Sequence, residues 1–317
     1  MNALLVLAVS AVALGVGAPL VLRRLRGLER WPTLTAWLWL AAPAGALTAV
    51  ALTGLLLLMP TRSLGMGVAE LLRTCVMALR AALSTPHDSS AGTVAGVLLV
   101  AAVAGGFVLG GSIAGLRAWR AARRHRELLA LAGRPAMGLA GVTELEHGRP
   151  FAYCLPGRPG PVVVSSAALR RLDAGQLAAV LAHERAHQAS RHHRLVLLAQ
   201  VLRVGFPWLP AARLARQAVA RLVELAADDA AARAQGRRQV AAALAALGET
   251  PAPEAALGAT LVSAGERVSR LVAPRQHGGG LALLAGVLVL VLPLAAQVAA
   301  VAFPLARVAG TAICPLG

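Results

Sequence analysis

Residues Leu177–His193 read LAAVLAHERAHQASRHH and include His183-Glu184-Arg185-Ala186-His187, an HExxH motif. The surrounding Ala, Leu and Gln residues favour a helix. Residues four positions apart lie on one face of a helix, so His183 and His187 can direct their imidazoles at one metal ion. Glu184 lies beside them, where it can accept a proton from metal-activated water. The motif therefore predicts a zinc hydrolase site on this helix.

The alternative interpretation of this motif is a surface helix with two hydrated histidines. Short motifs also arise by chance, so HExxH alone leaves that alternative open. The apolar residues Leu177, Val180 and Leu181 precede the histidines and favour a helix with one buried face.

A further metal ligand is predicted downstream, where Leu222–Ala232 reads LVELAADDAAA. Glu224 and Asp228 are four positions apart and share a helix face. The Glu224 carboxylate would complete a set of two histidines and one glutamate, which leaves a fourth position for water. Asp228 could accept the second N–H of a ligand histidine and fix its tautomer. A solvated acidic helix face is the alternative for such a pair.

The sequence HERAH followed by ELAAD resembles the gluzincin metallopeptidases, specifically the integral-membrane M48 and M56 families. The M56 family, which includes the β-lactam-sensing receptor proteases of bacteria, fits best because of the membrane layout described below. The resemblance implies one zinc ion per chain, bound by His183, His187 and Glu224. It also implies that Glu184 is the general base and that Asp228 supports a ligand histidine.

The stretch GERVSRL at residues 265–271 resembles a segment near the end of membrane M48-type catalytic domains. A histidine often precedes that segment in the family, and none does here. Arg267 is therefore a candidate for stabilising transition-state charge. A structural salt bridge is the alternative role for this arginine.

The composition predicts a membrane protein, with 57% hydrophobic and only 14% charged residues. Four stretches without acidic or basic residues reach the roughly 20 residues needed to cross a bilayer. We expect transmembrane helices at about 1–22, 33–59, 92–116 and 278–306. A cleaved signal peptide is the alternative for the first stretch, but it lacks a basic start and arginines follow it.

The net charge of +17 comes from 31 basic and 14 acidic residues. Arginines cluster after the first and third predicted helices, which by the positive-inside rule places residues 117–275 in the cytoplasm. Both termini, the loop 60–91 and the tail 307–317 would then lie outside a cell membrane that the chain crosses several times. Aromatic residues make up 3% of the chain, and no basic-aromatic platform for direct nucleic-acid binding is evident.

Between the third span and the HExxH helix, Phe151–Cys154 and Pro161–Ser165 are β-prone runs around a turn, which predicts a hairpin. In the family that the sequence resembles, such a strand holds extended substrate by backbone hydrogen bonds. A purely structural hairpin remains an equal alternative. Asp173 is suited to cap the N-terminus of the HExxH helix.

The segment after the motif contains two further histidines, His192 and His193. We expect them near the mouth of the site or in solvent, because the predicted ligand set is already complete. The apolar run Leu195–Leu202 is too short to span a bilayer. We expect it to dip into the membrane surface, close to any membrane-embedded substrate.

The chain has three cysteines, too few for a disulfide scaffold. Cys154 falls in the predicted cytoplasmic domain and should stay reduced. Cys75 and Cys314 both fall on the predicted outer side. A disulfide between them and two free thiols are equally compatible with the sequence.

These observations together predict a mainly α polytopic membrane protein with four transmembrane helices and a gluzincin-like cytoplasmic zinc protease domain that carries a small β-hairpin or sheet. The resemblance implies a bacterial membrane zinc endopeptidase that cleaves a protein or peptide at the cytoplasmic face. It further implies regulatory cleavage in signalling, of a transcriptional repressor or of the protease itself. No penicillin-binding sensor domain follows the last helix, so a β-lactam signal is not expected. Quality control of membrane proteins, as in the M48 type, and a non-proteolytic signalling scaffold are the alternatives.

Overall fold

The computed structural model describes residues 3–58, 77, 91–156, 160–248, 263–273 and 279–311. Cys75 and Cys314 lie outside these residues, so the structure tests neither alternative for them, a disulfide or two free thiols. Nearly all of the predicted outer loop and the end of the predicted tail also lie outside them.

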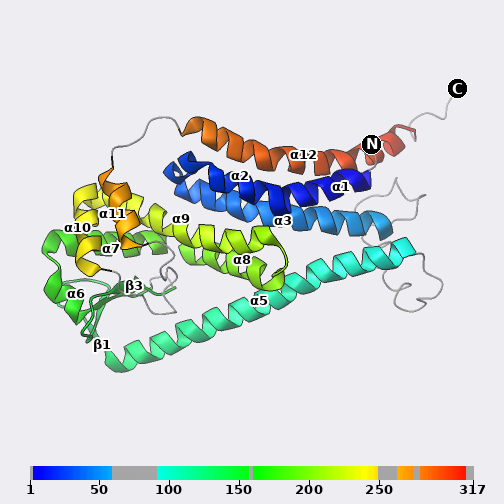
Figure 1. Ribbon diagram of the computed structural model, residues 1–317. Helices are drawn as coiled ribbons and strands as arrows, with labels where there is room; N and C mark the ends of the chain where they lie inside the picture. The colour runs from blue at the N-terminus through cyan, green and yellow to red at the C-terminus, as the bar shows by residue number, and fades with distance from the viewer. Residues whose placement is uncertain are drawn as a thin grey trace.

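Four helical spans are long and apolar enough to cross a membrane, which confirms this part of the fold prediction. A backbone in hydrocarbon must satisfy its hydrogen bonds within its own segment, so these runs of Ala, Leu and Val are helical. Figure 1 shows the first, second and fourth spans side by side, while α5 diverges from α3 toward the other end of the molecule. The spans are α1 (Ala3–Val12) continued by η1 (Ala13–Gly17) and α2 (Ala18–Arg24), α3 (Pro32–Leu58), α5 (Ala91–Ala132) and α12 (Gly280–Thr311).

A small sheet and four shorter helices lie together at one end of the helical bundle (Figure 1). The strands are β1 (Gly133–Pro135), β2 (Val142–Leu145), β3 (Ala152–Cys154) and β4 (Val162–Ser165). The helices are α6 (Ser166–Arg171), α7 (Ala174–Ala189), α10 (Arg237–Leu247) and α11 (Ala264–Val272). The sheet order is β1-β2-β4-β3, and β3 pairs antiparallel with β4, as the predicted hairpin requires. Strand β3 is therefore an edge strand, and α7 packs against it.

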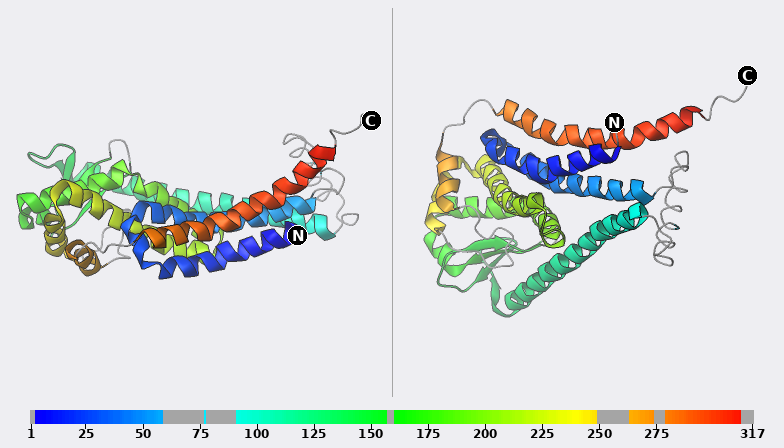
Figure 2. Two further views of the ribbon diagram at one scale, coloured as in Figure 1. Left: turned by 90° about the horizontal axis from the view of Figure 1, so that it is seen from above. Right: turned by 45° about the vertical axis from the view of Figure 1, so that its right-hand side comes forward.

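Helices α8 (His192–Gly205) and α9 (Pro210–Gln235) form a hairpin between two membrane spans. Helix α8 packs along α5, and α9 packs along α3. Figure 1 and the right-hand view of Figure 2 both show this hairpin filling the wedge between α3 and α5. The buried residues of the hairpin and those of the first two spans form one hydrophobic cluster. A second hydrophobic cluster contains residues of the sheet, α7, α10, α11 and the C-terminal end of α9. The run Leu195–Leu202 thus lies within the membrane bundle.

Glycines allow α5 and α8 to approach closely. A Cβ atom on Gly205 would lie 2.2 Å from the carbonyl oxygen of Gly106, and one on Gly110 would lie 2.4 Å from that of Val201. Around Gly105 and Gly111 of the same helix there is open space within 4 Å. Gly106 and Gly110 therefore face α8, whereas Gly105 and Gly111 do not.

We expect Gly110→Ala to lower the free energy of unfolding by about 1–3 kcal/mol, because the new methyl group overpacks the contact with α8. Gly111→Ala is the matched control, since its methyl group would meet open space. Thermal unfolding of the detergent-solubilised variants measures the difference. Equal midpoints for the two variants would contradict the close packing of the hairpin.

Candidate metal centre

Helix α7 positions the two histidines of the HExxH motif. Asp173 precedes this helix as its predicted N-cap. Its side chain accepts a hydrogen bond from the backbone N–H of Gln176, and the Gln176 side chain accepts one from the backbone N–H of Asp173, which completes a capping box. His183 and His187 follow one turn apart, and both side chains are buried in spite of their polarity. Their Nε2 atoms lie 3.1 Å apart. The two rings therefore point at one position.

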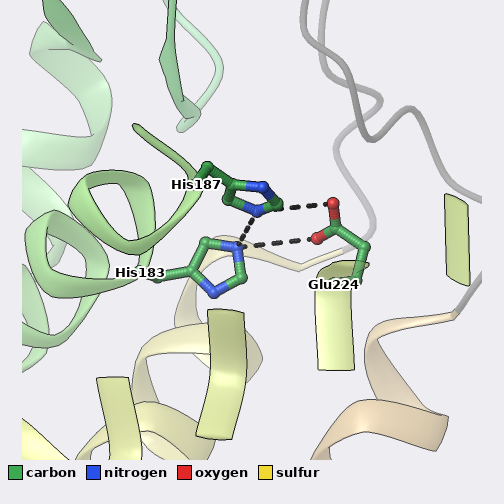
Figure 3. A group of neighbouring side chains, drawn as sticks. All are labelled: His183, His187 and Glu224. Atoms are coloured by element: carbon green, nitrogen blue, oxygen red, sulfur yellow. Dashed lines mark hydrogen bonds and ion pairs between the residues drawn. The ribbon is translucent and has the colours of Figure 1, made fainter. Parts of the chain in front are cut away.

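Glu224 of α9 reaches the same position from the opposite side (Figure 3). Its Oε2 lies 3.5 Å from Nε2 of His183, and its Oε1 lies 3.5 Å from Nε2 of His187. Ligand atoms about 2 Å from a tetrahedral zinc ion are roughly 3.3 Å from one another. The two imidazoles and the carboxylate, whose ligand atoms lie within 4.8 Å of one another, therefore fit a zinc ion.

The charged groups around this position also favour the binding of a cation. Burial lowers the pKa of His187 to about 4, so its imidazole is neutral and able to bind metal. Burial acts to lower the pKa of His183 too, but hydrogen bonds to Asp228 and Glu224 raise it to about 10. These carboxylates favour positive charge between them, which a divalent metal ion supplies.

Asp228 lies one turn after Glu224 on α9 and is almost completely buried. Its Oδ1 lies 3.0 Å from Nδ1 of His183, on the side of the ring away from the Glu224 carboxylate. Burial alone would raise the pKa of Asp228, but hydrogen bonds from Arg267 and His183 hold it well below its usual range. An ionised Asp228 accepts the Nδ1–H of His183 and leaves Nε2 free for a metal.

Arg267 of α11 forms a two-pronged ion pair with Asp228. Its Nε and Nη2 donate to the two carboxylate oxygens at 2.8 and 2.6 Å. Its Nη1 lies 3.3 Å from Oε2 of Glu224. The guanidinium therefore forms the salt bridge that the sequence analysis gave as its alternative role, and it also lies beside a candidate ligand.

Glu184 is buried next to His183, and burial raises the pKa of its carboxyl group, opposed by the charge of His183. The thiol of Cys154 on β3 lies beside this carboxylate, and burial together with the charge of Glu184 keeps the pKa of the thiol high. Sequence reasoning treated Cys154 only as a reduced thiol and did not foresee this contact.

His192 is a site residue that sequence reasoning placed wrongly at the mouth or in solvent. It is buried, with 1% of its surface exposed, and its Nδ1 lies 3.0 Å from Nδ1 of His187. Burial lowers its pKa to about 3, so the ring is neutral and its Nδ1 can accept the Nδ1–H of His187. Its Nε2 has no hydrogen-bond partner among the described residues. His192 thus accepts the Nδ1–H of His187, just as Asp228 accepts the Nδ1–H of His183.

In a comparison with known families, the model of Peptidase family M48 matches residues 117–215. Searches of curated proteins and of solved structures found no match. The aligned segment contains His183, Glu184 and His187, and it ends before Glu224. The match supports an M48-type metallopeptidase domain, in agreement with part of the predicted resemblance. The closer likeness to M56 stays a prediction.

We expect His192→Leu to weaken zinc binding by about 10–100-fold, because His187 loses the group that fixes its tautomer. His192→Asn should retain most of the affinity, since its Oδ1 can take the place of Nδ1. Chelator competition on the purified variants measures the dissociation constant. His193→Leu, at the adjacent half-buried position, is the control. Wild-type affinity in His192→Leu would show that the contact does not support the ligand.

Proposed function

We propose that this chain is an integral-membrane zinc-dependent endopeptidase that acts on protein substrates. The observation that carries the proposal is the convergence of His183, His187 and Glu224 on one buried position, with Glu184 beside it. The M48 match over the HExxH segment and the four apolar helices support a membrane-associated protease.

In the proposed reaction His183, His187 and Glu224 hold zinc. When bound, zinc supplies a Lewis acid that activates water and polarises the scissile carbonyl. Glu184 takes the proton from the attacking water and passes it to the leaving amide nitrogen. The raised pKa of Glu184 suits both steps, because it favours the protonated carboxyl group that holds the proton between its uptake from water and its transfer to nitrogen.

The groups around these residues keep them in position. Asp228 and His192 each accept an N–H from one ligand histidine, so both Nε2 atoms face the metal position. Arg267 neutralises the charge of Asp228. Its Nη1 lies beside the candidate ligand Glu224, so we propose that it also stabilises negative charge on the oxygen of the reacting carbonyl.

The edge strand β3 supports a mode of substrate binding. Its free edge can pair with an extended peptide through backbone hydrogen bonds. Cys154 at the end of this strand lies beside Glu184, and helix α7 packs against the strand, so the end of the strand lies close to the proposed catalytic base. This contact favours substrate binding over the purely structural hairpin.

The finer assignment is regulatory proteolysis in signalling at the cytoplasmic face of the cell membrane, with a repressor or the protease itself as substrate. Its support is the membrane layout shared with M56 proteins and the arginines that follow the first and third spans. Quality control of membrane proteins is the second candidate, and the M48 match favours it. A non-proteolytic scaffold would not need Glu184 beside its metal ligands.

The proposal is tested with zinc-loaded wild type and Glu184→Gln in detergent, on an unstructured protein substrate. Both should retain one zinc ion per chain. Cleavage by the variant should fall by at least about 100-fold, because the neutral amide of glutamine cannot take the proton from water. Glu127→Gln, an exposed glutamate on α5, is the matched control and should cleave like wild type.

Zinc retained with equal cleavage by Glu184→Gln would contradict the assignment of the base. A wild-type protein that binds no zinc would contradict the metal centre. Zinc binding without cleavage would favour the scaffold.

A further inference from the structure

A cluster of three arginines and one glutamine lies on the α8–α9 hairpin, near its tip. Arg203 of α8 and Arg213 of α9 are exposed, whereas Gln200 of α8 and Arg216 of α9 are half-buried. On each helix the two residues are three positions apart and so share a face. The Nε of Arg216 donates to Oε1 of Gln200 at 3.0 Å, and the charge of Arg203 is close enough to act on Arg216. These four residues are called the hairpin patch below.

The three positive charges of the hairpin patch have no acidic partner in the part of the chain that the structure describes. No carboxylate there lies within ion-pair distance of Arg203, Arg213 or Arg216. The Nη1 of Arg216 is shielded from solvent and has no hydrogen-bond partner among the same residues. Farther along α9, in contrast, Arg221 pairs with two carboxylates. The hairpin patch therefore carries charge that calls for an anion from outside these residues.

The groups that the hairpin patch offers to a ligand are hydrogen-bond donors. Guanidinium groups donate and cannot accept. Gln200 accepts from Arg216 through Oε1, which leaves the N–H groups of its amide for other acceptors. Such a set is complementary to an anion with several acceptor oxygens, and the planar fork of a guanidinium matches the oxygens of a phosphate group. A phosphate group therefore fits the hairpin patch in both charge and hydrogen bonding.

The packing of the hairpin on α5 gives the level of the hairpin patch in the membrane. Gly205, two residues after Arg203, packs on Gly106 of α5. At 1.5 Å per residue, Gly106 lies about 16 Å before Arg117, the first charge of that helix. The patch residues lie about 3–9 Å from the tip along the two arms, and so about 7–13 Å below the level of Arg117. This range falls within one leaflet of a hydrocarbon core about 30 Å thick.

From the charge and the level of the hairpin patch we infer that it binds the phosphate headgroup of an anionic phospholipid. Lipid phosphates lie at the edge of the leaflet, and arginine side chains extend toward them while their stems stay in apolar surroundings. An anionic lipid is favoured over a zwitterionic one, because the patch has no carboxylate to pair with a cationic headgroup. This inference does not depend on the proposed peptidase function.

A phosphate bound between the two arms would also stabilise the hairpin. It would offset the mutual repulsion of the arginines on α8 and α9. On α9 the patch ends at Arg216, eight residues or about 12 Å before Glu224, and on α8 Gln200 lies the same distance after His192. The lipid would therefore act on the two helices that carry Glu224 and His192 to the candidate metal centre.

The test uses the full-length protein in a neutral detergent. The lipid probes are phosphatidylglycerol and phosphatidylcholine with matched acyl chains, and inorganic phosphate is the probe for a free anion. Arg203→Gln combined with Arg213→Gln removes two charges at exposed positions of the hairpin patch. Arg233→Gln combined with Arg238→Gln is the matched control, since it removes two exposed charges at the far end of α9 and on α10. Native mass spectrometry measures the lipid dissociation constants, and thermal unfolding measures stabilisation.

We expect the wild type to bind phosphatidylglycerol at least about tenfold more tightly than phosphatidylcholine, and its unfolding midpoint to rise more with the anionic lipid. An arginine near an anionic lipid surface contributes about a fivefold factor in affinity, so the patch variant should bind phosphatidylglycerol about 25-fold more weakly. The control variant should keep the wild-type dissociation constant.

Equal affinity of the wild type for the two lipids would overturn this inference without any variant. Equal losses in the patch variant and the control would reduce the preference to general surface charge and would also overturn it. Stabilisation by inorganic phosphate without a preference between the lipids would leave an adventitious ion only. Wild-type dimers that the patch variant fails to form would assign this face to a second copy of the chain in place of a lipid.

Discussion

The carboxylate of Asp228 is the group on which the arrangement of the site depends. It accepts from His183 of α7 and from Arg267 of α11, and it is itself carried by α9. Three helices therefore meet at one buried charge. Removal of one partner from such a buried pair costs about 3–5 kcal/mol, because the other charge is left uncompensated. Leu271 is the one residue of α11 that is classed as buried, so polar contacts such as this one help to hold the helix in place.

A second set of ion pairs connects α11 and α9 to the membrane spans. Arg270 pairs with Asp229 and donates to the backbone carbonyl of Glu29, in the short 3₁₀ helix η2 (Arg26–Arg30) between the first two spans. Arg221 pairs with the side chains of both Glu29 and Glu266. These groups are partly exposed, so each pair contributes little alone. As a network they place α11 against both the metal centre and the membrane bundle.

The sequence revealed those features that depend on short-range periodicity or composition. The helical repeat alone brings His183 and His187 together, and uncharged stretches identify the membrane spans. His192 could not be placed this way, because Arg191 adopts a left-handed conformation with φ of 50° that ends one helix and redirects the next. The contact of Cys154 with Glu184 joins a strand to a helix and depends on tertiary packing.

The hairpin between α3 and α5 makes the candidate site part of the membrane bundle. A protease domain joined by a flexible linker could change its height above the bilayer. Here Glu224 lies on the helix that starts at the hairpin tip, and Gly205 has no free space toward Gly106. Close-packed interiors resist sliding, because any shift creates overlaps or voids. Helix length and glycine packing therefore fix the candidate metal position relative to the helical spans.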